Sequence, residues 1–292
     1  MSRLGAYMNT TKEIINRYNI RMTKSLGQNF LVDESIVRKI VDTAEVNGED
    51  LIIEIGPGIG SMTRELCARA GRVVAVEIDR HLIPALTDNL KGYDNIEIIN
   101  NDILKVDIER DILGKHRATG GLKPGHVKVV ANLPYYITTP IIMQLLEKEY
   151  GIDIMVFMVQ KEVADRMVAM PGGKDYGSLS VAVQYYSKAR KMFDVPPHCF
   201  IPQPDVYSSV IRLDVNKEPP VKVKDRAAFF KTVKAAFGQR RKTLLNALCN
   251  SGSFSKDKEQ IGEILKNMGL DENQRGETLT IEQFAELSNL LL

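Results

Sequence analysis

The first half of the chain repeats one pattern: a short apolar run, a turn, and a segment whose apolar residues have helical spacing. β-branched residues dominate the runs, which indicates buried strands joined by crossover helices. This alternation is typical of a mostly parallel sheet with helices on both faces, so the sequence predicts an α/β, Rossmann-like fold. The expected strands are 51–55, 72–78, 95–99, 127–131, 153–160, 179–186 and 209–215, and the expected helices are 61–70, 81–90 and 139–149.

The pattern changes near residue 216. Two adjacent prolines interrupt the chain at 219–220, and the rest has helical periodicity, with the spacing of a capping box at 280–283. We therefore expect two domains, an α/β domain over 1–215 with an N-terminal extension and a small all-α domain over 216–292. The stretch 115–125 holds three glycines and a proline, which predicts a surface loop.

Composition excludes several classes of protein. Of the 292 residues, 44% are hydrophobic and 26% are charged, as in an ordinary folded protein, and no apolar run is long enough to cross a bilayer. The N-terminus has no secretory signal pattern, so we expect a cytoplasmic protein. Cys67, Cys199 and Cys249 are far apart, and the histidines are scattered. We expect reduced thiols and no metal site.

The +2 net charge is unevenly distributed. Residues 217–249 contain nine Lys or Arg against two Asp or Glu, whereas 250–292 contain four against eight. A charge run of this kind is usually a solvated helix face, although it also suits a surface that contacts phosphates. Charge alone favours the solvated face.

A glycine-rich turn at 54–60 (EIGPGIG) lies between a predicted strand and a predicted helix, where a ligand can approach the backbone closely. Such a turn alone is weak evidence. Glu77 ends the next strand, 21 residues after Gly56, where a carboxylate can accept hydrogen bonds from ribose hydroxyls. Asp102 follows the third strand and can accept from an adenine amine. Taken alone, Asp102 is explained equally well as a helix N-cap, and Glu77 as an acidic loop residue. Their order and spacing together favour a cofactor site.

The surroundings of this turn favour a positively charged cofactor. It has the form GxGxG after the acidic Glu54, rather than GxGxxG, and Arg64 is the basic residue near the start of its helix. S-adenosylmethionine carries a sulfonium, an ammonium and no pyrophosphate, so it suits an electronegative setting better than NAD.

Asn132-Leu133-Pro134-Tyr135 follows the fourth strand, at the edge of the sheet where ligands of such folds bind. An adenine amine is a poor nucleophile because its lone pair is conjugated with the ring. The Asn132 side-chain carbonyl and a main-chain carbonyl of the Leu133-Pro134 turn can accept its two hydrogens and direct the lone pair to a methyl group. The methylated nitrogen becomes acidic, so no strong base is required.

Aromatic residues near this turn suit a flipped-out base. We expect Tyr135 to stack on the target adenine and Tyr136 to pack in the protein. Phe200, on a stiff segment with two prolines, is the candidate for the other face of the base, and its alternative is an ordinary core aromatic.

These motifs together resemble the ribosomal RNA adenine dimethyltransferase family, over nearly the whole chain. The segment 115–125 departs from the resemblance because it is longer than the family usually has. The matching segments are 24–31 (KSLGQNFL), 54–60 (EIGPGIG), 76–79 (VEID), 101–104 (NDIL), 131–140 (ANLPYYITTP), 200–209 (FIPQPDVYSS), 238–248 (GQRRKTLLNAL) and 275–287 (RGETLTIEQFAEL).

The resemblance implies an enzyme that uses S-adenosylmethionine to dimethylate two adjacent adenines near the 3′ end of 16S rRNA, in the small ribosomal subunit or its precursor. We expect it to be a monomer. The resemblance also implies that the basic tail docks on rRNA, which revises the interpretation from charge alone. The residues that it implies for RNA binding are Arg240, Arg241 and Lys242, on a helix. Those that it implies for cofactor binding are Gln28, Asn29, Leu31, Glu54, Gly56, Gly58, Glu77, Ile78, Asp102, Ile103 and Asn132.

Three alternatives stay open. A related enzyme that methylates an adenine of 23S rRNA would share the cofactor residues and much of the 132–135 turn. A non-catalytic assembly or transcription factor with the same fold would bind nucleic acid only, although the intact Glu77, Asp102 and Asn132 argue against lost chemistry. A small-molecule methyltransferase is disfavoured by the basic helical tail.

Overall fold

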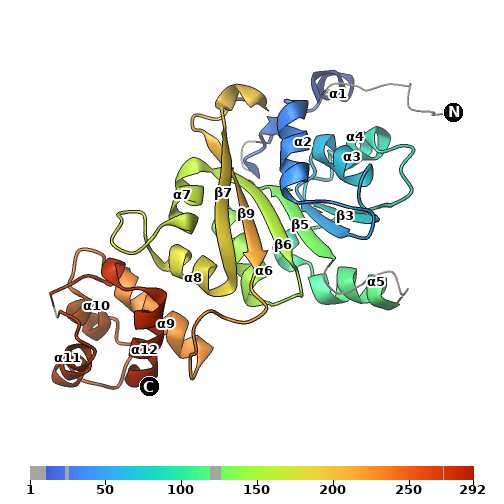
Figure 1. The fold of residues 1–292 in the computed structure, drawn as a ribbon. Coiled ribbons are helices and arrows are strands. Elements are labelled where there is room, and N and C mark those ends of the chain that lie inside the picture. The colour runs from blue at the N-terminus through green and yellow to red at the C-terminus, as the bar shows by residue number, and fades with distance from the viewer. Residues whose placement is uncertain (1–10, 24–25, 119–125, 272) are drawn as a thin grey trace. The chain divides into compact units, whose positions relative to one another are not determined.

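A computed structural model describes residues 11–23, 26–118, 126–271 and 273–292. It contains a seven-stranded sheet in the order β4-β3-β2-β5-β6-β9-β7 and a separate two-stranded sheet of β1 and β8 (Figure 1). The strands are β1 (Phe30–Leu31), β2 (Leu51–Ile55), β3 (Arg72–Glu77), β4 (Ile96–Asn100), β5 (Val127–Asn132), β6 (Ile154–Gln160), β7 (Ser187–Val195), β8 (Phe200–Ile201) and β9 (Ser208–Val215).

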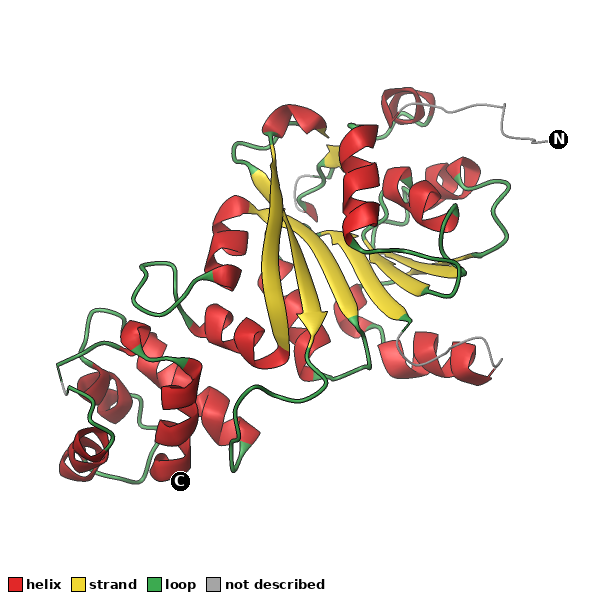
Figure 2. Ribbon diagram, viewed as in Figure 1, coloured by secondary structure: helices red, strands yellow, loops and turns green. Residues whose placement is uncertain are grey.

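Helices connect the strands and make up the C-terminal part of the chain (Figure 2). The α-helices are α1 (Thr11–Arg17), α2 (Glu34–Thr43), α3 (Ser61–Cys67), α4 (Ile83–Asn89), α5 (Gly114–Ala118), α6 (Thr138–Glu147), α7 (Lys161–Val168), α8 (Ser178–Tyr186), α9 (Arg226–Gly238), α10 (Leu244–Asn250), α11 (Lys258–Asn267) and α12 (Ile281–Leu291). The shorter helical segments are η2 (Ile103–Lys105), η3 (Ile108–Leu113), η4 (Pro197–Cys199) and η5 (Gly276–Thr278).

The large sheet is mostly parallel, as the alternating pattern predicts. Strands β4, β3, β2, β5 and β6 pair in parallel, and β9 pairs antiparallel to β6. All five residues of β2 are buried, which requires cover on both faces of the sheet. On one face the apolar sides of α2 and α3 pack against β2, β3 and β5 through a core that includes Ile40, Leu66, Ile52, Val73 and Val130.

One predicted strand was wrong. Residues 179–186 form most of helix α8, and the edge strand β7 follows directly at Ser187–Val195. Helix α8 is buried on nearly every side, so its apolar run has no polar face to reveal a helical period. Strand β7 was not predicted because it is rich in lysine and arginine, and the side chains between its two buried end residues alternate between exposed and intermediate positions.

The predicted loop at 115–125 was wrong at its start. Helix α5 continues to Ala118 directly after η3. Lys115 and His116 lie near Glu97 of β4, at 3.6 and 4.0 Å between nitrogen and oxygen. Residues 119–125 lie outside the described part of the chain.

The chain forms two compact units. One unit comprises residues up to 164 together with 190–215, and the other comprises 165–189 together with 216–292. The expected domains, 1–215 and 216–292, differ from these units in the segment 165–189, which belongs with the helical tail. The reason is that this segment carries helix α8, whose apolar residues pack within the helical unit.

The core of the helical unit is aromatic. The rings of Tyr185, Tyr186, Phe229 and Phe230 lie with centroids 5.0 to 5.5 Å apart, in tilted, edge-on and stacked pairs. The capping box predicted at 280–283 is confirmed at the start of α12. Among the described residues, no helix is long and apolar enough to span a bilayer, and no group of three acidic, cysteine or histidine side chains is arranged to hold a metal ion.

Candidate active site

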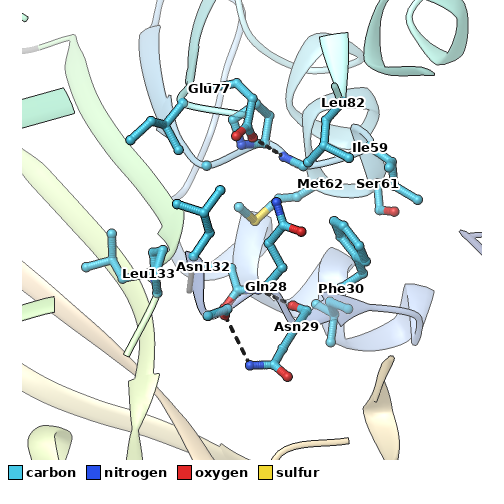
Figure 3. Close-up of a pocket in the computed structure, with 18 of the residues that line it drawn as sticks. Gln28, Asn29, Phe30, Ile59, Ser61, Met62, Glu77, Leu82, Asn132 and Leu133 are labelled. Carbon is cyan, nitrogen blue, oxygen red and sulfur yellow. Dashed lines mark hydrogen bonds between the residues drawn. The ribbon is translucent and has the colours of Figure 1, made fainter. Parts of the chain in front are cut away.

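A pocket opens at the carboxyl ends of β2, β3 and β5, the edge of the sheet predicted to hold the site (Figure 3). The N-terminal segment around β1 closes another side of it. The pocket is lined by residues 26–31, 54, 56–59, 61, 62, 77, 78, 82 and 132–135. It therefore brings together nine of the predicted cofactor residues: Gln28, Asn29, Leu31, Glu54, Gly56, Gly58, Glu77, Ile78 and Asn132.

The glycine turn after β2 requires glycine for two reasons. Gly56, Gly58 and Gly60 have φ angles of 68°, 60° and 88°, in the left-handed region that side chains disfavour. A Cβ on Gly58 would also lie 3.0 Å from a ring carbon of Phe30. The turn thus lets the backbone of the strand end reach the pocket, with an aromatic ring against it.

Glu77, the last residue of β3, is joined to this turn. One carboxylate oxygen accepts a hydrogen bond from Gly58 N at 3.0 Å, and the other accepts from Asp79 N at 2.8 Å. Glu77 is 4% exposed, and burial raises its pKa even though these hydrogen bonds favour the charged form. The carboxylate is therefore held at a fixed place on the pocket wall.

Glu54 adds a second acidic group to the same wall. It is fully buried, and neither carboxyl oxygen has a hydrogen-bond partner among the described residues. Burial raises its pKa to about 8; the nearby Thr63 hydroxyl opposes this shift, and the charge of Glu77 adds to it. An unsatisfied buried carboxyl is costly in free energy unless a partner compensates it, so the site fits a ligand that brings positive charge.

The N-terminal segment is held over the pocket by polar side chains. Gln28 donates from Nε2 to Asp79 Oδ2 at 2.8 Å and accepts from Thr23 N at 2.8 Å. Asn132 donates from Nδ2 to the main-chain oxygen of Asn29 at 3.0 Å. The Asn132 bond uses the amide nitrogen, which leaves the side-chain oxygen as the acceptor that this residue can offer a ligand.

The turn after Asn132 is tied to its surroundings through the backbone. Leu133 N donates to Met158 O on the neighbouring strand β6 at 3.1 Å. The carbonyl oxygen of Pro134 accepts from Ile137 N at 3.2 Å and from the Thr138 hydroxyl at 2.9 Å. Of the two carbonyls considered for the target amine, that of Pro134 is thus engaged in starting α6.

The two tyrosines of the turn differ from expectation in part. Tyr135 lines the pocket, and its hydroxyl shares a hydrogen bond with the Ser208 hydroxyl at 2.7 Å between oxygens. Burial raises the pKa of Tyr135. Tyr136, expected to pack, is 56% exposed, so that expectation was wrong. The turn that points Tyr135 inward leaves its neighbour facing solvent.

The stacking position expected for Phe200 is not where the structure places the ring. Phe200 is 1% exposed, does not line the pocket and belongs to the core cluster that contains Leu31 and Cys199. Pairing of β8 with β1, with Leu31 opposite Phe200, holds it there. The alternative interpretation, an ordinary core aromatic, describes it.

Asp102 and Ile103 also lie outside the pocket lining. Asp102 is the N-cap of η2 and accepts from Leu104 N at 3.0 Å, while Ile103 is 7% exposed. The capping interpretation of Asp102 is therefore confirmed, and its contact with an adenine ring stays a prediction. The pocket residues not predicted from the sequence are mostly apolar and adjoin the motifs: Leu26, Gly27, Phe30, Pro57, Ile59, Ser61, Met62 and Leu82.

The predicted RNA-binding residues lie in the turn between α9 and α10, not on a helix as expected. The helix ends at Gly238, and its C-cap, Gln239, has left the helical conformation. Arg240 donates to the main-chain oxygens of Lys174 and Tyr176 and pairs with Glu277 at 3.3 Å. Arg241 and Lys242 are exposed. All three residues are exposed, and Arg240, with half of its side chain accessible, is the one that these bonds hold to the rest of the helical unit.

Comparison with known proteins identifies the chain. Ribosomal RNA adenine dimethylase is a family whose characteristic sequence matches residues 19–287. The chain belongs to this family. It is 54% identical to the ribosomal RNA small subunit methyltransferase A of Clostridioides difficile (strain 630), over 100% of this chain and 98% of that protein. It is 55% identical to the protein of the same name from Geobacillus sp. (strain WCH70), over 96% and 95%.

Solved structures agree on the fold. A dimethyladenosine transferase from Plasmodium falciparum superposes with a TM-score of 0.70 at 24% identity, covering 87% of this chain and 94% of that one. The 23S rRNA methyltransferase ErmE superposes with a TM-score of 0.64 at 26% identity, covering 90% and 99%. The family member thus has the Rossmann-like sheet predicted from its sequence.

Proposed function

We propose that this protein transfers methyl groups from S-adenosylmethionine to the N6 amines of two adjacent adenines near the 3′ end of 16S rRNA, giving N6,N6-dimethyladenine. Relatives named ribosomal RNA small subunit methyltransferase A, 49–55% identical over nearly the full length, support the substrate. The observation that carries the chemistry is the hydrogen bond from Asn132 Nδ2 to the Asn29 carbonyl. It engages the amide nitrogen and leaves the Asn132 side-chain oxygen free to accept a hydrogen bond at the pocket.

The cofactor wall, residues 54, 56–58, 77 and 78, fits S-adenosylmethionine. Its Glu54 carboxyl, which has no hydrogen-bond partner among the described residues, suits a ligand with an ammonium and a sulfonium, and Glu77 would accept from ribose hydroxyls. Ile78, 46% exposed, offers an apolar surface for the adenine ring. When bound, the cofactor supplies an electrophilic methyl group. Gln28, Asn29 and Leu31 would border it, and Asp102 and Ile103 are proposed for its adenine end.

The target wall, residues 132–135, would hold the base. Asn132 Oδ1 and the Leu133 carbonyl would accept the two amine hydrogens, because the Pro134 carbonyl already accepts two hydrogen bonds. Both acceptors are neutral, so they orient the amine without removing its proton beforehand. Tyr135 would stack on the base, and the proton released after transfer would leave to solvent.

RNA docking would use the exposed residues Arg241 and Lys242 of the tail, while Arg240 would stabilise the turn through its bonds to Lys174 and Tyr176. Phosphate contacts of this kind position the RNA and carry no sequence information. We place the protein in the cytoplasm, where small subunits are assembled, and propose that it acts as a monomer.

The test is methyl transfer from labelled S-adenosylmethionine onto small subunits that lack the modification, compared with large subunits and free adenosine. We expect label only on small subunits, with mass spectrometry locating two adjacent dimethyladenines. Label on large subunits would favour the 23S rRNA activity of ErmE, the structural relative. Label on adenosine would favour a small-molecule enzyme, and RNA binding without any transfer would favour a non-catalytic assembly factor.

A further inference from the structure

Ser208 contacts the target wall from a distant part of the chain. Its Oγ lies 2.7 Å from Tyr135 Oη, although the two residues are 73 positions apart. Ser208 is 1% exposed, so its hydroxyl has little access to water. Nothing in the cofactor chemistry involves this serine.

Both partners of this hydrogen bond are fixed to the same strand. In the register of β9 on β6, Ser208 lies opposite Gln160, at the end of β6. On the other side of β6, Met158 O accepts from Leu133 N, which anchors the turn that carries Tyr135. The hydroxyl pair therefore connects two backbones that β6 already holds, so it can restrict only the tyrosine side chain.

The next residue, Ser209, makes a different contact. It is fully buried and donates from Oγ to Asp194 Oδ1 at 2.7 Å. Asp194 also pairs with Lys161 at 2.7 Å and Lys191 at 3.1 Å, and these contacts hold its pKa well below the usual range. Because successive side chains of a strand point to opposite faces, Ser208 and Ser209 act on separate neighbours. Ser209 is thus a matched control for Ser208.

We propose that Ser208 is a positioning residue, which holds the ring of Tyr135 in the plane that stacks on the target adenine. The inference rests on the proposed function, because it assigns Tyr135 to the base. A tyrosine at a pocket wall can rotate about χ1 and χ2, and stacking rewards only the rotamer that faces the base. The hydroxyl bond selects that rotamer before RNA arrives, so less conformational freedom of the ring is lost on binding.

The test uses Ser208→Ala, Tyr135→Phe, the double variant and Ser209→Ala. Tyr135→Phe keeps the aromatic ring and removes only the hydroxyl. We expect Ser208→Ala and Tyr135→Phe each to lower kcat on small subunits about two- to tenfold, the size of one neutral hydrogen bond. The affinity for S-adenosylmethionine is unchanged in both. The double variant is no slower than the slower single variant, because both remove the same contact.

Ser209→Ala also removes a buried hydroxyl bond, so we expect a lower Tm with kcat unchanged. A loss of kcat in Ser209→Ala equal to that in Ser208→Ala would overturn the proposal, since any disturbance of β9 would then suffice. So would a double variant whose loss is the product of the two single losses.

A readout without RNA separates this inference from the proposed function. In protein with 13C-labelled tyrosine rings, the Tyr135 signals, assigned from Tyr135→Phe, should show faster ring motion in Ser208→Ala than in wild type. Identical ring motion would overturn the inference even if rRNA is methylated. If the wild-type protein methylates no rRNA but Ser208→Ala still speeds the ring motion of Tyr135, the proposed function is overturned. The restraint of Tyr135 by Ser208 then stands.

Discussion

The cofactor wall and the target wall of one pocket are built in different ways. The cofactor wall is acidic, and its hydrogen bond joins residues that are close in sequence. Glu77 accepts from Gly58, 19 residues before it, and Glu54 is buried on the same wall. The target wall is neutral and held from far away, by bonds from Asn132 to Asn29 and from Tyr135 to Ser208, 103 and 73 positions apart. In the proposed function the acidic wall would bind a cationic cofactor, whereas the neutral acceptors, held by long-range hydrogen bonds, would orient an amine.

The largest effect is expected at Asn132. In Asn132→Ala the target amine loses its side-chain acceptor, and we expect kcat on small subunits to fall about 10²- to 10³-fold, as for other lost electrostatic stabilisers of a transition state. RNA binding should remain largely intact, as measured by filter binding. Asn267→Ala, an exposed asparagine at the end of α11, is the matched control. Retained turnover in Asn132→Ala would refute the proposed role.

Glu77→Gln tests the other wall. The amide replaces one acceptor oxygen by a donor, next to backbone N–H groups that now lack a charged partner. We expect the dissociation constant for S-adenosylmethionine, measured by calorimetry, to rise about ten- to a hundredfold, with kcat at saturation changing much less. Glu286→Gln on the exposed side of α12 is the control. A fall in kcat with unchanged affinity for S-adenosylmethionine would contradict the proposal that Glu77 acts in cofactor binding and not in methyl transfer.

Substitutions in the basic turn should affect neither wall. We expect Arg241→Ala and Lys242→Ala each to weaken binding to small subunits a few-fold. Each should also reduce the slope of the logarithm of the binding constant against the logarithm of salt concentration by about one. Arg240→Ala should instead lower the Tm, because Arg240 bonds to Lys174, Tyr176 and Glu277. Cofactor affinity should be unchanged in all three. Equal effects of the three substitutions on RNA binding would contradict this separation.

The smallest effect concerns the charge of Glu54. Its pKa of about 8 in the folded protein exceeds the ordinary carboxyl pKa of the unfolded chain, so the unfolded state loses this proton first. The stabilisation from the neutral group is therefore full in acid and is lost as the pH rises to about 8. Glu54→Gln cannot titrate, so its Tm relative to wild type should rise by roughly 5 °C between about pH 5 and about pH 9. A pH-independent difference between the two melting temperatures would contradict the assignment.

Local patterns explain why much of this protein was predictable. The parallel strands, the glycine turn, Glu77 and the capping box at 280–283 depend on residues that are close in sequence, and these appear where expected. Two predictions that differ from the structure, the strand at 179–186 and the pocket position of Phe200, have another cause. A run buried on all sides has no visible period, and an aromatic residue near a strand has the same appearance in a core as at a site.

The sequence by itself predicted the class of fold, the glycine turn with its neighbouring acidic residues, and the family, because each depends on patterns or motifs that are local in the chain. Only the tertiary structure decided which distant side chains bond at the pocket. Asn132 donates to the Asn29 carbonyl, and the hydroxyls of Tyr135 and Ser208 share a hydrogen bond. Hydrogen bonds between residues about a hundred positions apart depend on how the strands pair, and strand pairing is decided by the packing of the whole sheet.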